Sequence, residues 1–325
     1  MSPVVCPACG RKASTPLEYI DVAEQHRSYA PDDQIMQEDL TAAASESALA
    51  YQMLKCQNCG LEFGEPMRAP SAAWYQLAYR AQKLYPEVRW EFNEVLRRIP
   101  KGNHVFEFGC GSGSFLLCCQ QHGLSASGID FSNDAVQECV ARGLAVQRLD
   151  LREIACETEA DHFNQMAAFH FLEHLDRPAT LFELAAARAL PSSHLWVSVP
   201  ADRRPSRFFG ERDFLDQPPH HMTRWTIDSF RAIGRCHGWR LSDTFYEPIT
   251  LRAALWSISV SSTTYRKLNN AGKFQNPAVE RIFRAFFMPA AMLRRLTIDR
   301  HLTGFSMLAH FVFDIDDKRV APEPV

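Results

Sequence analysis

The sequence lacks features that would place the protein in a membrane or on nucleic acid. It contains no run of about 18 apolar residues, so no membrane-spanning helix is expected. The formal net charge is −3, and without a basic excess no general affinity for nucleic acid is expected. The N-terminus has no basic stretch followed by an apolar one, so we expect no signal peptide and a cytoplasmic protein.

Residues 105–114 resemble a nucleotide-binding turn, but they lack glycine at the last position of the dinucleotide-binding fingerprint. In residues 105–114, an apolar run with one acid leads into Gly109, Gly111 and Gly113. Ser114 stands where the dinucleotide fingerprint G-x-G-x-x-G requires glycine, which argues against NAD or FAD. What is present is a strand, a glycine turn and a helix start, and this order forms a nucleotide-sized crevice at the carboxyl end of a strand.

Length and patterning predict an α/β protein. The 325 residues are 46% hydrophobic and 22% charged, which allows a sizeable core and one large or two modest domains. Short apolar segments alternate with segments of helical periodicity, and this order predicts a parallel sheet. The predicted strands are 104–108, 125–129, 144–149, 163–169, 194–199 and 239–246, and the predicted helices are 113–123, 132–142, 177–190 and 226–238.

The glycine turn resembles motif I of the class I S-adenosylmethionine (SAM) dependent methyltransferases, (E/D)-x-G-x-G-x-G. Glu107, Gly109, Gly111 and Gly113 match this motif position by position, and the resemblance extends over roughly residues 101–239. It implies a Rossmann-like α/β sheet, mostly parallel with an antiparallel last strand expected at 305–313, and it implies SAM as the cofactor. A tight strand-to-helix turn without a ligand is the alternative.

Residues after the glycine turn predict further SAM contacts. Asp130 ends the second strand 21 residues after Gly109, where a carboxylate can accept both ribose hydroxyl protons, and Ser132 is the better N-cap of the next helix. Phe131 is expected to pack against the adenine ring. The resemblance adds Asp150 near the adenine amino group, Leu151 as a backbone contact, Glu107 facing the SAM amino group, and Cys110, Gly111 and Gly113 around its amino-acid end.

Two histidine-containing stretches resemble small-molecule methyltransferases related to the ubiquinone O-methyltransferases. The first, residues 169–178, resembles an LEHL-x-x-P signature, which implies that His170 contacts the methionine part of SAM. Acids near this signature bind a divalent ion in those enzymes, and His170 at one such position argues against that ion here. The second stretch, residues 217–225, contains Pro-Pro-His-His, whose prolines would hold His220 and His221 at a fixed depth.

These histidines are the candidate catalytic residues, because histidine titrates in the range that a general base needs. His221 is the first candidate for a general base or acceptor contact, with His174 and His220 as the others. The alternative is that the histidines only organise the loop. The long loop after the strand predicted at 194–199 contains His220 and His221, and also Arg203, Arg204 and Arg207. These arginines are candidate partners for phosphate or carboxylate groups of an acceptor.

Ten cysteines without a secretion signal favour a reducing compartment and metal binding over disulfides. Two C-x-x-C-G pairs, Cys6 with Cys9 and Cys56 with Cys59, predict a closed structural zinc site of four thiolates. Zinc would also supply folding free energy that so small a segment lacks. Four reduced, uncoordinated cysteines are the alternative. The insert between the pairs contains an acidic part, 32–47, that we expect to be loop or weak helix.

The patterns divide the chain into four segments: a zinc-ribbon-like module at 1–70, a helical cap of the SAM pocket at 71–100, the SAM-binding core at 101–246, and helices with a final strand at 247–325. In the cap we expect two helices joined near Pro86, with Tyr75 or Tyr79 touching the ligand. Residues 279–300 mix arginines with large apolar side chains. This mixture fits a peripheral membrane helix, or a helix packed within the fold or on a second subunit of a homodimer.

The sequence therefore predicts a SAM-dependent methyltransferase that acts on a small molecule, such as a sugar, a cell-surface metabolite or a secondary metabolite, through an O, C or N nucleophile. An RNA methyltransferase that grips its substrate with the zinc module is one alternative, and the net charge of −3 argues against it. A non-catalytic SAM-binding protein with a zinc scaffold is the other, and the same motifs are compatible with it.

Overall fold

The computed structural model describes residues 4–44, 47–82, 89–151, 162–208, 213–250, 254, 281, 285 and 302–314. The chain divides into two compact units. The first comprises Met1–Val199, Phe214–Phe245 and Leu308–Val325, and the second comprises Pro200–Asp213 and Tyr246–Met307. The predicted SAM contacts, the candidate catalytic histidines and the paired cysteines all belong to the first unit.

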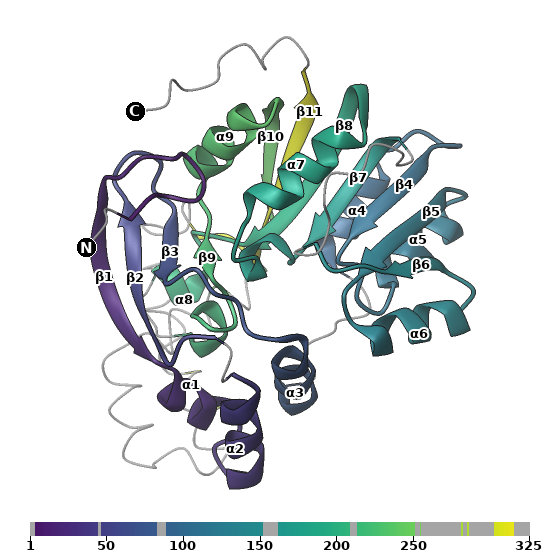
Figure 1. Cartoon of the computed structure of the whole chain (residues 1–325). Coiled ribbons are helices and arrows are strands. Elements are labelled where there is room, and N and C mark those ends of the chain that lie inside the picture. Colours follow the sequence, from purple (N-terminus) through teal and green to yellow (C-terminus); the bar gives the residue numbers. More distant parts are fainter. Residues whose placement is uncertain are drawn as a thin grey trace. The chain divides into compact units, whose positions relative to one another are not determined.

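A mixed sheet organises the carboxyl-terminal part of the first unit (Figure 1). Its strands are β4 (His104–Phe108), β5 (Ser125–Asp130), β6 (Ala145–Arg148), β7 (Phe163–Phe169), β8 (Ala189–Pro200), β10 (Trp239–Tyr246) and β11 (Ser306–Phe313). The strand order is β10-β11-β8-β7-β4-β5-β6. β4 pairs in parallel with β5 and β7, β5 with β6, and β7 with β8. The predicted α/β fold with a mostly parallel sheet is therefore confirmed.

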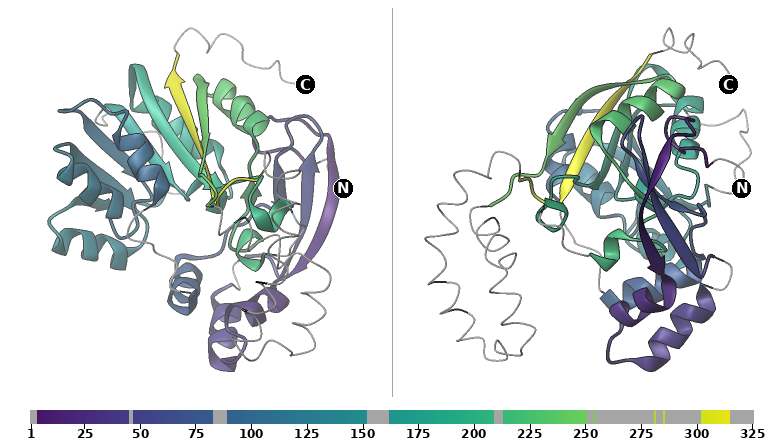
Figure 2. Two further views of the ribbon diagram at one scale, coloured as in Figure 1. Left: turned by 180° about the vertical axis from the view of Figure 1, so that it is seen from behind. Right: turned by 90° about the vertical axis from the view of Figure 1, so that its left-hand side faces the viewer.

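Helices pack on both faces of this sheet, which can be followed in Figure 2. They are α4 (Trp90–Leu96), α5 (Ser114–Gln121), α6 (Asn133–Ala141), α7 (Ala179–Ala187) and α9 (Ile227–Cys236). Because side chains alternate between the faces of a strand, residues of β11 pack into the apolar cores on both faces of the sheet. Leu308 lies in the same apolar cluster as Phe92 of α4, whereas the ring of Phe311 contacts Phe182 of α7 and Phe230 of α9.

The helix before β8 is shorter than predicted, and the strand is longer. The helix expected at 177–190 ends at Ala187, and β8 begins at Ala189 rather than at 194. Pro191 has no N–H to donate and cannot continue a helix. In addition, the N–H of Phe163 donates to the carbonyl of Arg188, which draws the chain into the sheet at once.

The cysteine pairs belong to a second, antiparallel sheet of the first unit. It consists of β1 (Ser14–Asp21), β2 (Ala50–Cys56), β3 (Glu62–Glu65) and β9 (Thr223–Arg224), in that order. No pattern in the sequence predicted these strands. β9 comes from the 217–225 loop, more than 150 residues away from β3 in the chain, and pairs Glu62 with Arg224.

The insert between the cysteine pairs contains two helices, α1 (Val22–Tyr29) and α2 (Gln34–Ala43). The sequence left loop or weak helix open over 32–47, and the structure has a helix over most of this segment. Asp33 caps this helix by accepting from the N–H of Met36, and Leu40 is fully buried in a cluster with Trp74 of α3 (Ala72–Gln82). Tertiary burial of one apolar face stabilises a helix whose acidic sequence is only weakly helical.

Several predictions fall on residues that the structure does not describe. Residues 83–88, with the joint predicted near Pro86, lie outside the described ranges, as does 279–300 apart from Arg281 and Ala285. The membrane and homodimer alternatives for that segment stay predictions. Among the described residues, we find no helix with the length and apolar character to cross a membrane.

Candidate active site

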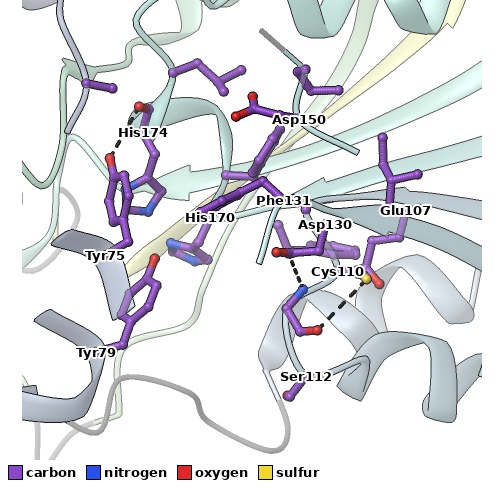
Figure 3. Close-up of a pocket in the computed structure, with 18 of the residues that line it drawn as sticks. Tyr75, Tyr79, Glu107, Cys110, Ser112, Asp130, Phe131, Asp150, His170 and His174 are labelled. Carbon is purple, nitrogen blue, oxygen red and sulfur yellow. Dashed lines mark hydrogen bonds between the residues drawn. The ribbon is translucent and has the colours of Figure 1, made fainter. Parts of the chain in front are cut away.

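A cavity of about 300 Å³ opens at the carboxyl ends of β4, β5 and β7. The chain runs from β4 to β5 on one side, whereas β7 flanks β4 on the other, so this is the topological switch point where open α/β sheets bind ligands. The predicted site residues that line the cavity are Glu107, Gly109, Cys110, Gly111, Asp130, Phe131, Asp150, Leu151, His170, His174, His220 and His221. Figure 3 shows how most of them converge on one space.

The glycine turn has the conformation that its sequence requires. Gly109, Gly111 and Gly113 have φ angles of 67°, 52° and 75°, which side chains disfavour. Gly113 was expected to leave room for SAM, but it does not line the cavity. A Cβ there would instead collide with Leu144 and meet the sulfur of Cys139 at 2.8 Å, so this glycine lets α5 pack against α6 and β6.

Asp130 is a buried carboxylate at the end of β5. One oxygen accepts from the N–H of Gly111 at 2.8 Å and the other from the N–H of Ser132 at 2.8 Å. Burial raises the pKa of Asp130, and these backbone hydrogen bonds oppose that shift. A third backbone hydrogen bond, from Phe131, also lowers the pKa of Asp130. Since a carboxylate offers about four acceptor sites, Asp130 can accept another hydrogen bond. As predicted, Ser132 caps α6, with its hydroxyl accepting from the N–H of Ala135.

Glu107 is the penultimate residue of β4, near Asp130, and is almost fully buried. Its Oε2 has no hydrogen-bond partner within the described part of the chain. Burial, and then the charge of Asp130, raise the pKa of Glu107 well above its usual value. A buried acid with an open oxygen in a cavity is complementary to a cationic group. Together with the ribose-type acceptor at Asp130, it fits a ligand with the ammonium and ribose of SAM.

His170 lies between two buried acids. Its Nε2 is 2.8 Å from Oε1 of Glu91, and its Nδ1 is 3.3 Å from Oε1 of Glu173. Burial lowers the pKa of His170, but the adjacent acids Glu173 and Glu91 outweigh burial and raise it overall. Burial conversely raises the pKa of Glu173, and the adjacent His170 with nearby histidine charges lowers it to about 2. Glu91, on α4, was missed because nothing in its local sequence marks it.

Three histidine rings gather at the other end of the cavity. The ring centroids of His174, His220 and His221 are 4.7–5.0 Å apart, and one ring nitrogen of each lies within 4.8 Å of the others. Burial lowers the pKa of His174 to about 4 and that of His220 well below its usual value, so both are neutral near pH 7. The cluster is close enough to share one substrate atom or one ion.

Hydrogen bonds from three directions hold the loop that carries two of these histidines. The N–H of Met222 donates to the carbonyl of Glu173, and the N–H of Gly64 in β3 donates to the carbonyl of Met222. The hydroxyl of Tyr75 donates to the carbonyl of His220 at 3.2 Å. Tyr75 and Tyr79 also line the cavity, which is where the sequence analysis expected one of them to touch the ligand.

The four paired cysteines converge. The sulfurs of Cys6 and Cys59 are 3.7 Å apart, those of Cys9 and Cys56 are 3.5 Å apart, and all four lie within 4.8 Å of one another. A tetrahedral zinc with bonds of about 2.3 Å separates its sulfurs by about 3.8 Å, so the donor set fits this ion. In each pair a backbone hydrogen bond closes the turn, from the following glycine to the carbonyl of the first cysteine.

The loop arginines belong to the second unit. There the guanidinium of Arg203 lies 5.4 Å from the ring centre of Tyr246, and Arg204 donates to the carbonyl of Ala201. Their assignment as partners of an anionic acceptor stays a prediction.

The fold, glycine turn and cavity define a methyltransferase of the Rossmann-like class. A family model described as "Methyltransferase domain" matches residues 77–243, just over half of the chain. The chain therefore belongs to this family, and its resemblance to the class I SAM-dependent methyltransferases is confirmed.

More particular relatives are ubiquinone biosynthesis O-methyltransferases. The protein from Hahella chejuensis is 28% identical over 148 residues, 42% of this chain and 61% of the relative, and that from Coxiella burnetii is 28% identical over 105 residues, 30% of this chain and 44% of the relative. The chain thus spans less than two thirds of these relatives. A SAM-dependent methyltransferase from Archaeoglobus fulgidus shares 19% identity, with 74% of this chain and 100% of that chain covered and a TM-score of 0.47.

Proposed function

We propose that this protein transfers a methyl group from SAM to a small-molecule acceptor. One observation carries the proposal: the buried acid Glu107, whose Oε2 has no partner among the described residues, and Asp130 lie in one cavity with three histidines. The acidic end suits the cationic, ribose-bearing cofactor, and the histidine end suits an acceptor that must lose a proton.

In this proposal Asp130 accepts hydrogen bonds from the ribose hydroxyls, and Glu107 pairs with the ammonium group of SAM. Phe131 covers the adenine ring, Asp150 and Leu151 bind its edge, and the glycine turn with Cys110 contacts the methionine part together with His170. When bound, SAM supplies a methyl group on a positive sulfonium with a good leaving group. The protein's task is alignment, which contributes about 7–11 kcal/mol in favourable cases.

The acceptor meets the methyl group at the histidine end. His221 is the proposed general base, because its imidazole lines the cavity, and His174 and His220 are proposed as acceptor contacts that can take over this role. The two curated relatives bear names of O-methyltransferases, which supports a hydroxyl nucleophile. A small acceptor is favoured over RNA, since the net charge is −3.

We further propose that Cys6, Cys9, Cys56 and Cys59 bind one structural zinc ion. The convergence of the sulfurs and the two closed turns support this assignment. A closed four-thiolate site has no open position for chemistry, so zinc would have a structural role and would not contact the substrate.

The test is methyl transfer from isotope-labelled SAM into a cell extract, with the small-molecule and RNA fractions separated afterwards. Label in a small molecule supports the proposal, and label in RNA favours the alternative. Calorimetry with SAM and with its demethylated product provides the binding arm. A folded protein that binds neither ligand would exclude the activity altogether, whereas binding without any labelled product would favour a non-catalytic SAM-binding protein.

A further inference from the structure

A line of buried charged groups leads from His221 to the sheet that carries the cysteine pairs. Nδ1 of His221 is 3.4 Å from Oδ1 of Asp216, and Oδ2 of Asp216 is 3.1 Å from Nε of Arg224. Nη1 of Arg224 is in turn 3.0 Å from Glu18 and 3.2 Å from Glu62. The side chains of His221, Asp216 and Arg224 are only 11%, 5% and 9% exposed, so solvent screens these contacts little.

The contact with Asp216 determines which nitrogen of His221 carries the proton. An ionised carboxylate can only accept a hydrogen bond, so Nδ1 must donate, and Nε2 keeps the lone pair that a base needs. Oε1 of Glu173 lies 4.0 Å from Nε2, beyond hydrogen-bond distance. The charge of Glu173 can therefore stabilise the imidazolium that forms after proton uptake without occupying Nε2 beforehand.

Arg224 holds Asp216 at two points. Its Nε is 2.7 Å from the backbone carbonyl of Asp216 as well as 3.1 Å from the carboxylate. Arg224 itself is fixed as a residue of β9, which pairs with Glu62 of β3, and Glu18 belongs to β1. The four residues Glu18, Glu62, Arg224 and Asp216, from three strands and one short helical turn, thus form a largely buried network, unlike a lone surface ion pair.

We propose that Asp216 is a positioning residue that orients His221 as the base, and that Arg224 anchors Asp216 to the strands of the four-cysteine module. This inference rests on the proposed methyltransferase activity. It gives the N-terminal module a role in the chemistry, because β1 and β3 supply the carboxylates that hold Arg224.

The first test replaces Asp216 by asparagine. The amide can donate to Nδ1 and thereby move the ring proton to Nε2, which blocks proton uptake; in a comparable triad this change costs about 10⁴-fold in turnover. We expect Asp216→Asn to lower the initial rate of labelled product by at least about 100-fold. Binding of the demethylated product should stay within about twofold, because Asp216 does not line the cavity.

The second readout needs no acceptor. Proton–nitrogen correlation spectra of protein labelled with ¹⁵N-histidine report the tautomer of each ring, and His221→Gln identifies the His221 signals. We expect the Nδ1–H tautomer in the wild-type protein and its loss in Asp216→Asn. A merely structural role of Asp216 would broaden or shift many signals and leave the tautomer of His221 unchanged.

The matched control is Asp228→Asn, which removes an exposed acid whose ion pair with Arg231 lies on the surface of α9. It should change neither the rate nor the tautomer. Arg224→Lys keeps the charge but loses the planar fork, and it should reproduce part of the tautomer change. If Arg224→Lys fails to fold, Glu62→Gln weakens the contact of Arg224 with β3 instead and should have the same partial effect on the tautomer.

Two results would overturn the inference: a rate for Asp216→Asn within about threefold of wild type, or an Nδ1–H signal of His221 that survives the substitution. A wild-type protein that forms no labelled product would count against the proposed function, and the spectra would still show whether Asp216 sets the tautomer of His221.

Discussion

At the scale of single residues, two buried glutamates have pKa values shifted in opposite directions. The adjacent His170 helps to lower the pKa of Glu173 to about 2, whereas burial and the charge of Asp130 raise the pKa of Glu107 well above its usual value. The sequence predicted Glu107 and Asp130 because each has a fixed distance from the glycine turn. It could not predict Glu91 or Asp216, whose roles arise from contacts across the fold.

The raised pKa of Glu107 makes a pH-dependent prediction. The folded state keeps a proton that the unfolded state releases above the ordinary value of 4.5, so the free energy of unfolding falls as pH rises from there through the folded-state pKa. Glu107→Gln removes this loss. Urea unfolding of the SAM-free protein at about pH 5 and about pH 8 should show a stabilising effect of the substitution that is larger at the higher pH. If Glu107→Gln changed the free energy of unfolding equally at both pH values, the raised pKa of Glu107 would be contradicted.

Asp130 makes a prediction about affinity. Hydrogen bonds to a charged group contribute about 1.5–3 kcal/mol, so Asp130→Asn should weaken binding of the demethylated product by about 10-fold to 150-fold in calorimetry. Asp134→Asn is the control, because that residue is an exposed acid at the start of α6. Equal affinities for the two variants would show that Asp130 does not bind the ribose.

At the scale of elements, local patterns predicted the seven-stranded sheet better than the four-stranded one. Apolar runs marked β4, β5, β7 and β10 within a residue or two. β9 has only two residues, and it is a strand solely because Glu62 of β3 lies opposite Arg224. No sequence pattern in so short a segment can specify a pairing with a partner that distant.

The packing of α5 depends on Gly113, and Gly123 offers a matched control. Both have φ angles near 75°, but a Cβ on Gly113 would meet Leu144 and Cys139, whereas a Cβ on Gly123 would meet nothing within 4 Å. Gly123→Ala should cost about 1–2 kcal/mol of backbone strain, and Gly113→Ala about 1–3 kcal/mol more from overpacking. Thermal unfolding measures both, and equal losses would contradict the packing role.

At the scale of the whole first unit, the cysteine module is connected to the loop that carries His220 and His221. Thr226 donates its hydroxyl proton to the carbonyl of Cys59 at 3.0 Å. β9, which ends two residues before Thr226, pairs with β3. Loss of zinc should therefore affect the loop of His220 and His221, although no cysteine of the two pairs lines the cavity.

Cys56→Ser tests this connection. Apparent zinc-binding free energies in small modules are about 10–16 kcal/mol, so the variant should lose its zinc in metal analysis and unfold at a lower temperature. Hydrogen exchange should also accelerate at the amides of Gly64 and Met222. Cys236→Ser, at an exposed position on α9, should leave all three measurements unchanged. A metal-free wild-type protein would contradict the zinc assignment itself.

The sequence by itself determined the α/β order, the glycine turn, the SAM-type acids and the cysteine pairs, because each depends on spacing along a few neighbouring residues. Only the tertiary structure decided that α2 is a helix, that a side chain on Gly113 would meet Leu144 and Cys139, and that Glu91 contacts His170 while Asp216 lies between His221 and Arg224. The physical reason is that burial and pairing between remote segments set these outcomes, and such energies have no local signature in the chain.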